Sequence, residues 1–279
     1  MQATRSDYSV GVLLLLVSAL TFSSAGLFTK GVVAGAWAVI FWRGLFAGIF
    51  TTLWTLQQGT FRQNFFSMGR SGLAVGVIGA IGTACFIPAF KLTSIANVAL
   101  IFASSPLIAS VLAWVCIGER PSGRTIAGAC MALIGVGIIV SGSFGASSLH
   151  GDALAFIMTL VMSGVMVIYR ARPQTPGAGP SVLQSLFLLL PAFFLGQPLQ
   201  TEAFEVLILM AFGILFAIAS VTLAEGAKRV PSGQTALLSS LETPLAPLLA
   251  FLVLAEVPNT ATFLGGAVVF AAVLLSMPK

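Results

Sequence analysis

The sequence has 279 residues, of which 58% are hydrophobic and only 8% are charged, and its formal net charge at pH 7 is +5. A soluble domain carries about 25% charged residues, so this composition excludes a water-soluble globular protein and predicts a chain solvated by lipid. The basic residues stand singly or in pairs, without a basic stripe, which argues against nucleic acid as a partner.

Ten apolar runs follow one another along the chain. Each is close to the ~20 residues that a helix needs to cross about 30 Å of hydrocarbon. The seventh is the weakest, because it is short and contains Pro191. We therefore predict an all-α polytopic membrane protein with ten transmembrane helices. The predicted spans are 9–29, 37–57, 71–90, 96–117, 125–142, 151–169, 181–197, 204–224, 232–254 and 260–277.

One stretch of the sequence occurs twice. Residues 226–277 repeat the pattern of residues 89–142 at a distance of 137 residues, so that Glu256 corresponds to Glu119. Each copy holds a polar turn, an apolar run interrupted by proline, a Glu/Pro turn and a glycine-rich apolar run. Such a repeat indicates an internally duplicated membrane protein.

The repeat divides the chain into residues 1–145 and residues 146–279, with five predicted spans in each part. Because five is odd, the second part has to enter the membrane upside down relative to the first. Two inverted five-helix repeats around a central cavity are typical of secondary transporters that work by alternating access.

The basic residues predict the orientation of the chain. With both ends in the cytoplasm, only Lys30 and Lys91 fall on the outer side, and Arg43 falls within a span. The other ten basic residues fall on the cytoplasmic side: Arg5, Arg62, Arg70, Arg120, Arg124, Arg170, Arg172, Lys228, Arg229 and Lys279.

Arg43 lies well inside the second predicted span, where a charge is costly and points to a function. Ala47 and Thr51 follow at helical spacing and form a small, mildly polar stripe with it, whereas Phe41 and Leu45 lie on the opposite side. This pattern predicts that Arg43 faces the protein interior. The alternative is that its side chain reaches outward to the membrane surface.

Glu242 is the second ionisable group within a span, with Thr235, Ser239 and Ala246 expected on its face of a continuous ninth helix. Arg43 and Glu242 could line the cavity and meet the carboxylate and the ammonium of a zwitterionic substrate. They could equally form a structural pair, or each bond to backbone carbonyls and hydroxyls of neighbouring helices.

Prolines interrupt spans at corresponding places of the two parts: Pro106 in the fourth span, and Pro244 with Pro247 in the ninth. Matching interruptions are the best sequence indication of a transporter binding site. Pro88 is expected to kink the third span. Small polar residues surround the interruptions, and they either contact substrate or hold helices together: Asn97, Ser104, Ser105, Ser239, Ser240 and Thr243.

Other residues have simpler interpretations. Trp42 either stacks on an aromatic or apolar substrate or belongs to the core. The turns at Glu119 and Glu256 are expected to cap helices or to pair at the surface. Four glycines of the third span predict a close helix contact, and three cysteines are interpreted as small buried hydrophobic residues: Gly72, Gly76, Gly79, Gly82, Cys85, Cys116 and Cys130.

The sequence has no catalytic set, no cluster of metal ligands and no phosphate-binding loop, so we expect neither an enzyme nor a cofactor or metal site.

Several segments resemble the EamA domain of the drug/metabolite transporter superfamily. In the first part these are SALTFSSAGLFTK (18–30), FWRG (41–44), AFKLTS (89–94) and SSPLIASVLAWVCIGERPS (104–122), and a second copy starts at GDALAFIMTLVMSGVMVIYR (151–170). The resemblance implies ten helices in an inverted arrangement and export of small metabolites through the bacterial inner membrane. Within the family, the chain is most similar to an exporter of aromatic amino acids.

The family's arginine in the second helix falls on Arg43 and its fourth-helix proline on Pro106, but the second part has only Gln184 near the position that corresponds to Arg43. We therefore predict an asymmetric site in a carrier that exports amino acids, with lipids and small molecules as its partners. A carrier for drugs, sugar phosphates or nucleotide sugars, or a scaffold without transport activity, stays open as an alternative.

Overall fold

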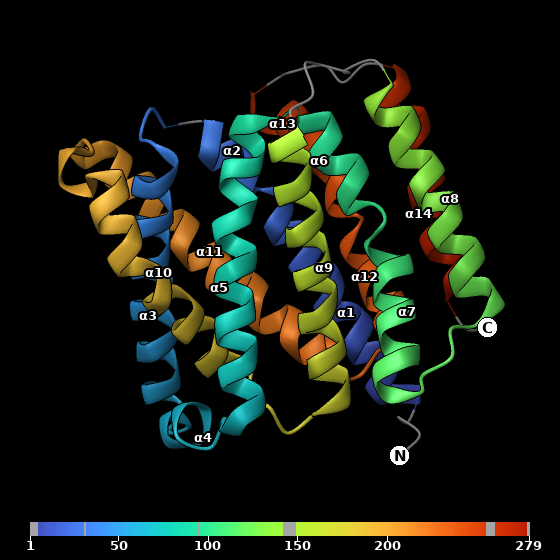
Figure 1. The fold of residues 1–279 in the computed structure, drawn as a ribbon, viewed down its shortest axis with the longest axis horizontal. Helices are drawn as coiled ribbons and strands as arrows, with labels where there is room; N and C mark the ends of the chain where they lie inside the picture. The colour runs from blue at the N-terminus through green and yellow to red at the C-terminus, as the bar shows by residue number, and fades with distance from the viewer. Residues whose placement is uncertain (1–4, 31, 94, 142–148, 255–259, 278–279) are drawn as a thin grey trace.

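The computed structural model describes residues 5–30, 32–93, 95–141, 149–254 and 260–277 (Figure 1). Within these ranges the chain forms helices and no strand, so the all-α prediction is confirmed. The elements are α1 (Arg5–Ser23), α2 (Ala25–Lys30), α3 (Ala36–Gln57), α4 (Phe61–Phe65), α5 (Gly69–Leu92), α6 (Ile95–Phe102), α7 (Ser105–Ile117), α8 (Gly123–Val140), α9 (Leu149–Ala171), α10 (Ala178–Gly196), a 3-10 turn η1 (Pro198–Gln200), α11 (Ala203–Ala227), α12 (Ser232–Ser239), α13 (Glu242–Leu254) and α14 (Thr260–Ser276).

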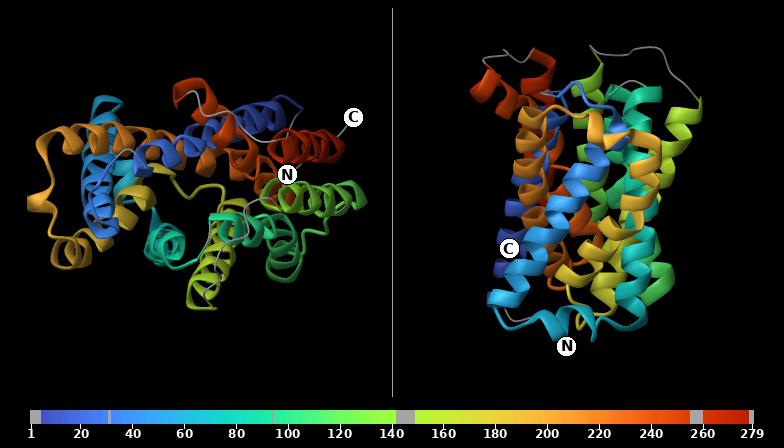
Figure 2. Two further views of the ribbon diagram at one scale, coloured as in Figure 1. Left: turned by 90° about the horizontal axis from the view of Figure 1, so that it is seen from above. Right: turned by 90° about the vertical axis from the view of Figure 1, so that its left-hand side faces the viewer.

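Seven helical segments of the described chain are long and apolar enough to cross a membrane, and two further apolar helices, Gly123–Ile139 and Thr260–Ser276, are shorter. The helices run between two ends where most connections gather (Figure 2). We name them the α4 end, at the bottom of Figure 1, and the α2 end, at the top. The seven segments are Ser6–Ser23, Ala36–Gln57, Gly69–Ala89, Leu100–Ile117, Leu149–Ala171, Ala178–Gly196 and Ala203–Ala227.

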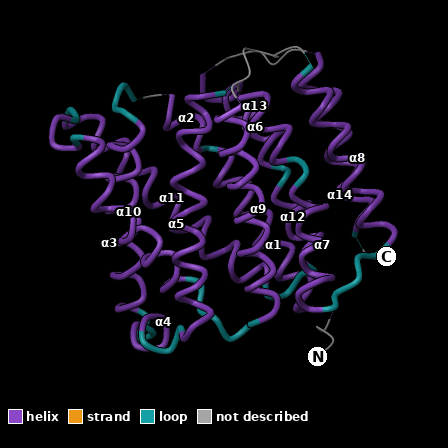
Figure 3. Tube along the Cα trace, in the orientation of Figure 1, coloured by secondary structure: helices purple, strands orange, loops and turns teal. Residues whose placement is uncertain are grey.

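The fourth and ninth predicted spans are each broken in the middle. Loop separates α6 from α7, as Figure 3 shows, and two residues separate α12 from α13. Pro106 and Pro244 stand in the first turns of α7 and α13, where a missing backbone N–H is tolerated. The interruptions therefore fall at matching positions, as predicted. The boundaries also match at the repeat distance of 137 residues: Ile95 with Ser232, Phe102 with Ser239, Ser105 with Glu242, and Ile117 with Leu254.

The first predicted span is also broken, which the sequence did not predict. The hydroxyls of Ser23 and Ser24 donate hydrogen bonds of 2.6 Å and 2.7 Å to the carbonyls of Leu20 and Thr21. Such local bonds compete with the helical ladder, and α1 ends here before α2 begins. The expectation of one continuous first helix is therefore wrong. Pro88, in contrast, lies inside α5, which continues past it to Leu92.

Helices from the two halves of the chain pack against one another. We call residues 5–141 the N-terminal half and residues 149–277 the C-terminal half. The most extensive contacts join α8 to α14, α3 to α10 and α5 to α9, and each of these pairs takes one helix from each half. Neither half therefore forms a compact body of its own.

The glycines of α5 allow one of these close approaches. A Cβ atom added to Gly76 would lie 2.8 Å from Leu183, and one added to Gly79 would lie 2.3 Å from the amide oxygen of Gln184. Gly82 meets α9 in the same manner. Real Cβ atoms do not come this close, so a larger residue at these positions would force the side chains of Leu183, Gln184 and Met162 to move. Three of the four glycines thus make the close helix contact that the sequence predicted.

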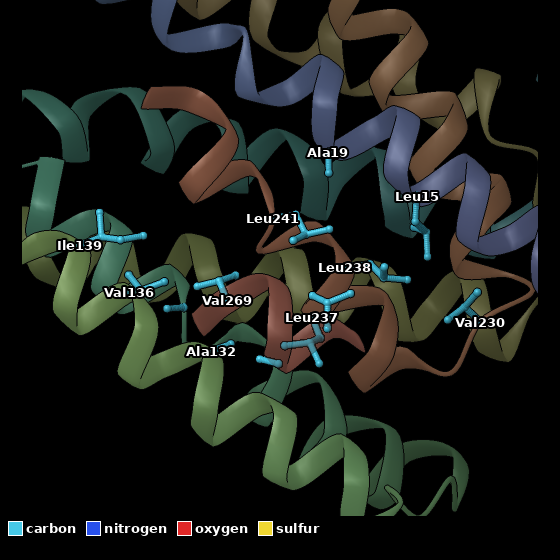
Figure 4. Packing of buried hydrophobic residues seen from close by; sticks show 13 residues of the cluster. Leu15, Ala19, Ala132, Val136, Ile139, Val230, Leu237, Leu238, Leu241 and Val269 are labelled. Carbon is cyan, nitrogen blue, oxygen red and sulfur yellow. The ribbon is translucent and has the colours of Figure 1, made fainter. Parts of the chain in front are cut away.

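The broken ninth span is anchored in the largest apolar cluster (Figure 4). Leu237, Leu238 and Leu241 lie on both sides of the end of α12 and are at most 2% exposed. They pack with Leu15 and Ala19 of α1 and with side chains of α8 and α14. Burial of each leucine contributes about 1.5–3 kcal/mol, so the cluster holds the end of α12 firmly against α1, α8 and α14.

The outer surface of the bundle is apolar. Val115 is 75% exposed and Phe194 is 73% exposed, as suits side chains that face lipid. Cys116 and Cys130 lie on this surface, and Cys85 is half-buried. The expectation that all three cysteines are buried is wrong, because a hydrophobic residue of a lipid-facing helix needs no protein around it.

Candidate functional site

Arg43 faces the interior of the bundle, as its helical neighbours predicted. It is 5% exposed, and Ala47 and Thr51 on the same stripe of α3 are each 2% exposed. Ile49, on the opposite side, is 47% exposed. The alternative in which Arg43 reaches outward to the membrane surface is therefore wrong in this structure.

Two aromatic rings of α11 surround the Arg43 guanidinium. Its central carbon lies 4.0 Å from the centre of the Phe216 ring and 5.6 Å from that of Phe212. A desolvated cation over such a ring gains about 2 kcal/mol. Placing an arginine at the centre of a membrane helix costs about 2.5–3.5 kcal/mol on insertion scales, so the rings offset much of this cost.

Arg43 nevertheless lacks a polar partner among the described residues. Its Nε atom is buried without a hydrogen-bond acceptor, and the Oγ1 atom of Thr51 on the same stripe is buried without a partner as well. The expected structural pair with Glu242 does not form in the described structure, nor does a bond to backbone carbonyls. A buried donor without an acceptor costs about 1–3 kcal/mol or more, which marks this position as one that can gain from an anionic ligand.

Trp42, the neighbour of Arg43, contacts η1, the turn between α10 and α11. Its indole Nε1 donates a 3.0 Å hydrogen bond to the carbonyl of Pro198 in η1, and its ring stacks on Phe46 at 5.8 Å between centroids. The side chain therefore ties α3 to the turn before α11. This anchoring is the packing role that was the alternative to a stacking contact with substrate.

The break between α6 and α7 presents a further unpartnered polar atom. Ser105 begins α7 and is completely buried, and its Oγ atom has no hydrogen-bond partner. Its carbonyl accepts a 3.4 Å hydrogen bond from the hydroxyl of Ser163 on α9. The hydroxyl of Ser104 instead bonds to the carbonyl of Ile101. The side chain of Asn97 lies outside the described part of the structure.

Glu242 begins α13, directly after the break in the ninth span. Its carboxylate has no hydrogen-bond or ion-pair partner among the described residues, and its side chain is partly exposed. A carboxylate in the first turn of a helix is favoured by the helix dipole, by about 0.3–1 kcal/mol at exposed sites. Thr243 follows it in the same turn, and the side chain of Pro247 lies outside the described part.

The predicted face of Glu242 is wrong, because it assumed a continuous helix. Thr235 and Ser239 belong to α12, and α13 begins only at Glu242. Their hydroxyls bond to backbone carbonyls at 3.3 Å and 3.0 Å, to Val230 and Thr235 respectively. Ser239 is therefore satisfied within its own helix in this structure.

Residues next to each of the two ionisable groups contact α1. Phe216, the ring nearest Arg43, makes an edge contact of 5.9 Å with Phe22 of α1. Leu241, the residue before Glu242, packs in one cluster with Ala19, about one helical turn before Phe22. The structure thus brings the surroundings of Arg43 and Glu242 to the same segment of α1, without direct contact between the two side chains.

Sequence reasoning missed several residues around these groups. Phe212 and Phe216 are two of many phenylalanines in the chain, and no spacing singles them out. Ser163 and Thr159 gave a weak signal, since they stand one helical turn apart within an apolar run. In the described part of the chain no group of histidine, cysteine or acidic residues could hold a metal ion.

The profile of the EamA-like transporter family matches the chain twice, over residues 9–141 and 148–277. The chain belongs to the EamA-like transporter family. The family consists of membrane transporters within the drug/metabolite superfamily, so small-molecule substrates and membrane lipids are its partners. The family's domain is therefore present twice in the chain.

A solved structure described only as "Crystal structure of protein" has a similar fold to this EamA-family chain. It is 22% identical, the alignment covers 96% of each chain, and the TM-score is 0.83. This similarity concerns the fold alone. A comparison with curated proteins finds no match.

Proposed function

We propose that this EamA-family chain is a secondary carrier of the bacterial inner membrane. It exports amino acids, aromatic ones in particular, and related small metabolites by alternating access. The proposed arrangement is ten membrane spans in two inverted five-helix repeats, with both chain ends in the cytoplasm. The breaks of the fourth and ninth spans at the repeat distance of 137 residues support this arrangement, because inverted carriers place broken helices at their binding site.

The observation that carries the substrate proposal is the pair of unpartnered ionisable groups beside α1. Arg43 would receive the carboxylate of an amino acid, since its guanidinium is buried and lacks an acceptor. Glu242 would receive the ammonium group, since its carboxylate has no cationic partner among the described residues. A site with one cationic and one anionic side chain suits a zwitterion. The same pair disfavours a substrate with several negative charges, because Glu242 would repel it.

The remaining candidate residues supply shape and hydrogen bonds in this proposal. The rings of Phe212 and Phe216 beside Arg43 favour an aromatic or apolar body attached to the carboxylate. The resemblance of the sequence to the bacterial aromatic amino-acid exporter YddG points to the same substrate class. Further contacts are proposed for Asn97, Ser105 and Thr243, and for Trp42 and Ser239 once their hydrogen bonds to Pro198 and Thr235 are released during transport.

Transport into proteoliposomes that hold the purified protein tests the proposal. The panel contains labelled aromatic and aliphatic amino acids, a sugar phosphate and a lipophilic cation, each with and without a pH gradient. Saturable movement of aromatic amino acids supports the proposal. Movement of the sugar phosphate or the lipophilic cation alone would assign the carrier to another solute class, and no movement of any solute would contradict a carrier for this panel.

A further inference from the structure

The broken fourth and ninth spans meet at one end of the bundle and not at the other. Towards the α4 end, α7 packs against α12, and α12 also contacts α8 and α9. Towards the α2 end, the described parts of α6 and α13 form no comparable contact. Under the orientation predicted from the basic residues, the α4 end is cytoplasmic. The described helices are therefore closed together on the cytoplasmic side of the proposed site.

Glu119 joins the two halves of the chain at this closed end. Its Oε2 atom accepts a 2.7 Å hydrogen bond from the Nε atom of Arg170 at the end of α9. Its Oε1 atom accepts a 2.9 Å hydrogen bond from the backbone N–H of Ser232, the first residue of α12. Arg170 in turn donates to the carbonyl of Lys228 at 3.3 Å. The Glu119 turn thus forms the predicted ion pair and also accepts a hydrogen bond from the first turn of α12, whereas Glu256 lies outside the described residues.

Within the described chain, both donors to the Glu119 carboxylate come from the C-terminal half, while Glu119 itself stands in the connection between α7 and α8. One carboxylate therefore fixes the end of α9 and the start of α12 to the N-terminal half. Bonds to an ionised group are stronger than bonds between neutral groups, and partial exposure of these side chains, 28% for Arg170 and 22% for Glu119, weakens them.

A tight steric contact between α7 and α12 lies next to these bonds. A Cβ atom added to Gly233, the second residue of α12, would lie 2.2 Å from the hydroxyl oxygen and 3.4 Å from the Cβ of Ser110 on α7. Gly233, Ser110, Glu119 and Arg170 also wall one cavity of about 170 Å³. Separation of α7 from α12 has to break both the bonds of Glu119 and this contact.

We propose that Glu119 is a latch that keeps the cytoplasmic end closed while the carrier is in its outward-open state. When the carrier changes to the inward-open state, Glu119 releases Arg170 and Ser232. This inference rests on the alternating-access carrier proposed above. Its two halves separate at the α7–α12 contact, and the loss of two hydrogen bonds to one carboxylate sets part of the cost of that step.

Thiol labelling tests the latch without a known substrate. The background is a protein in which Cys85, Cys116 and Cys130 are replaced by alanine. Ser110→Cys, a nearly isosteric change at the closed contact, then supplies the single cysteine. Inside-out vesicles are treated with a membrane-impermeant maleimide, which reaches the cytoplasmic face. Adding Glu119→Gln is expected to raise the labelling rate of this cysteine about tenfold.

Glu225→Gln is the matched control. Glu225 loses the same charge on the same side, but it pairs only with Lys228 and Arg229 of its own half. The introduced cysteine is expected to be labelled at the same rate with Glu225→Gln as in the protein that carries Ser110→Cys without this change. Equal labelling in the Glu119→Gln and Glu225→Gln proteins would overturn the latch. The two proposals can fail separately. If Glu119→Gln speeds labelling but the protein transports no solute of the panel, the latch is supported and the proposed substrate class is contradicted.

A disulfide across the contact gives a second measurement. The 3.4 Å distance between the Cβ positions of residues 110 and 233 is close to the ~3.5–4.5 Å of natural disulfides. Ser110→Cys with Gly233→Cys is therefore expected to form a disulfide on oxidation. In the same protein a third cysteine, Ala109→Cys, reports opening. The disulfide should abolish its labelling from the cytoplasmic side, and reductant should restore that labelling. Unchanged labelling of the cross-linked protein would contradict closure at this contact.

Discussion

Replacing Arg43 by methionine separates binding from stability. Arg43 has ring contacts but no hydrogen-bond acceptor among the described residues. Arg43→Met loses about 2 kcal/mol of cation–π attraction. It removes a charge that costs about 2.5–3.5 kcal/mol in a membrane helix, and the new sulfur gains about 0.3–1.5 kcal/mol against the rings. The free energy of unfolding is therefore expected to rise by about 1–3 kcal/mol.

Transport should respond in the opposite direction. A lost hydrogen bond between a cation and a carboxylate costs about 1.5–3 kcal/mol, which corresponds to a rise in KM of about 10- to 100-fold for an aromatic amino acid. Thermal unfolding in detergent measures stability, and proteoliposome uptake measures KM. Arg62→Met in the exposed α4 controls for charge loss. A large fall in Tm would show that Arg43 has a structural partner, and an unchanged KM would refute its contact with substrate.

Three further substitutions test other positions. Glu242→Gln should lower Tm by at most about 4 °C, because the carboxylate has no partner among the described residues and loses only the helix-dipole interaction of about 0.3–1 kcal/mol. Uptake should fall, and full uptake would remove Glu242 from the site. Gly265→Ala places a Cβ 2.4 Å from a backbone oxygen of α8, so overpacking of about 1–3 kcal/mol should lower Tm by roughly 2–10 °C. Gly137→Ala, with open space around it, should not lower Tm, and equal values for the two alanine variants would contradict the close helix contact. Trp42→Phe loses the hydrogen bond to Pro198, so unfolding should become easier by about 1 kcal/mol; an unchanged Tm would show that this bond is not needed.

The sequence predicted the fold well where its signal was periodic or repeated. Apolar runs located the helices, and the repeat located the two proline interruptions. The small stripe of Ala47 and Thr51 oriented Arg43 correctly, because α3 is regular over that stretch. These are properties that a local pattern determines.

The sequence could not predict contacts made between distant helices. The rings that surround Arg43 come from α11, and only the packing of α3 against α11 selects them among the phenylalanines. The face of Glu242 was wrong because the break before α13 changes the helical phase. The break at Ser24 depends on hydroxyl bonds to nearby carbonyls, which many serines within helices make without ending them.

The pairing of helices across the two halves has a consequence for biosynthesis. When translation has produced only the first half, α8 lacks α14 and α3 lacks both α10 and α11. The guanidinium of Arg43 then enters the bilayer before the rings that accommodate it have been made. We therefore expect α3 and α8 to expose their unpaired faces to lipid or to the insertion machinery until their partners are made, and a chain truncated after α8 to stay incompletely packed.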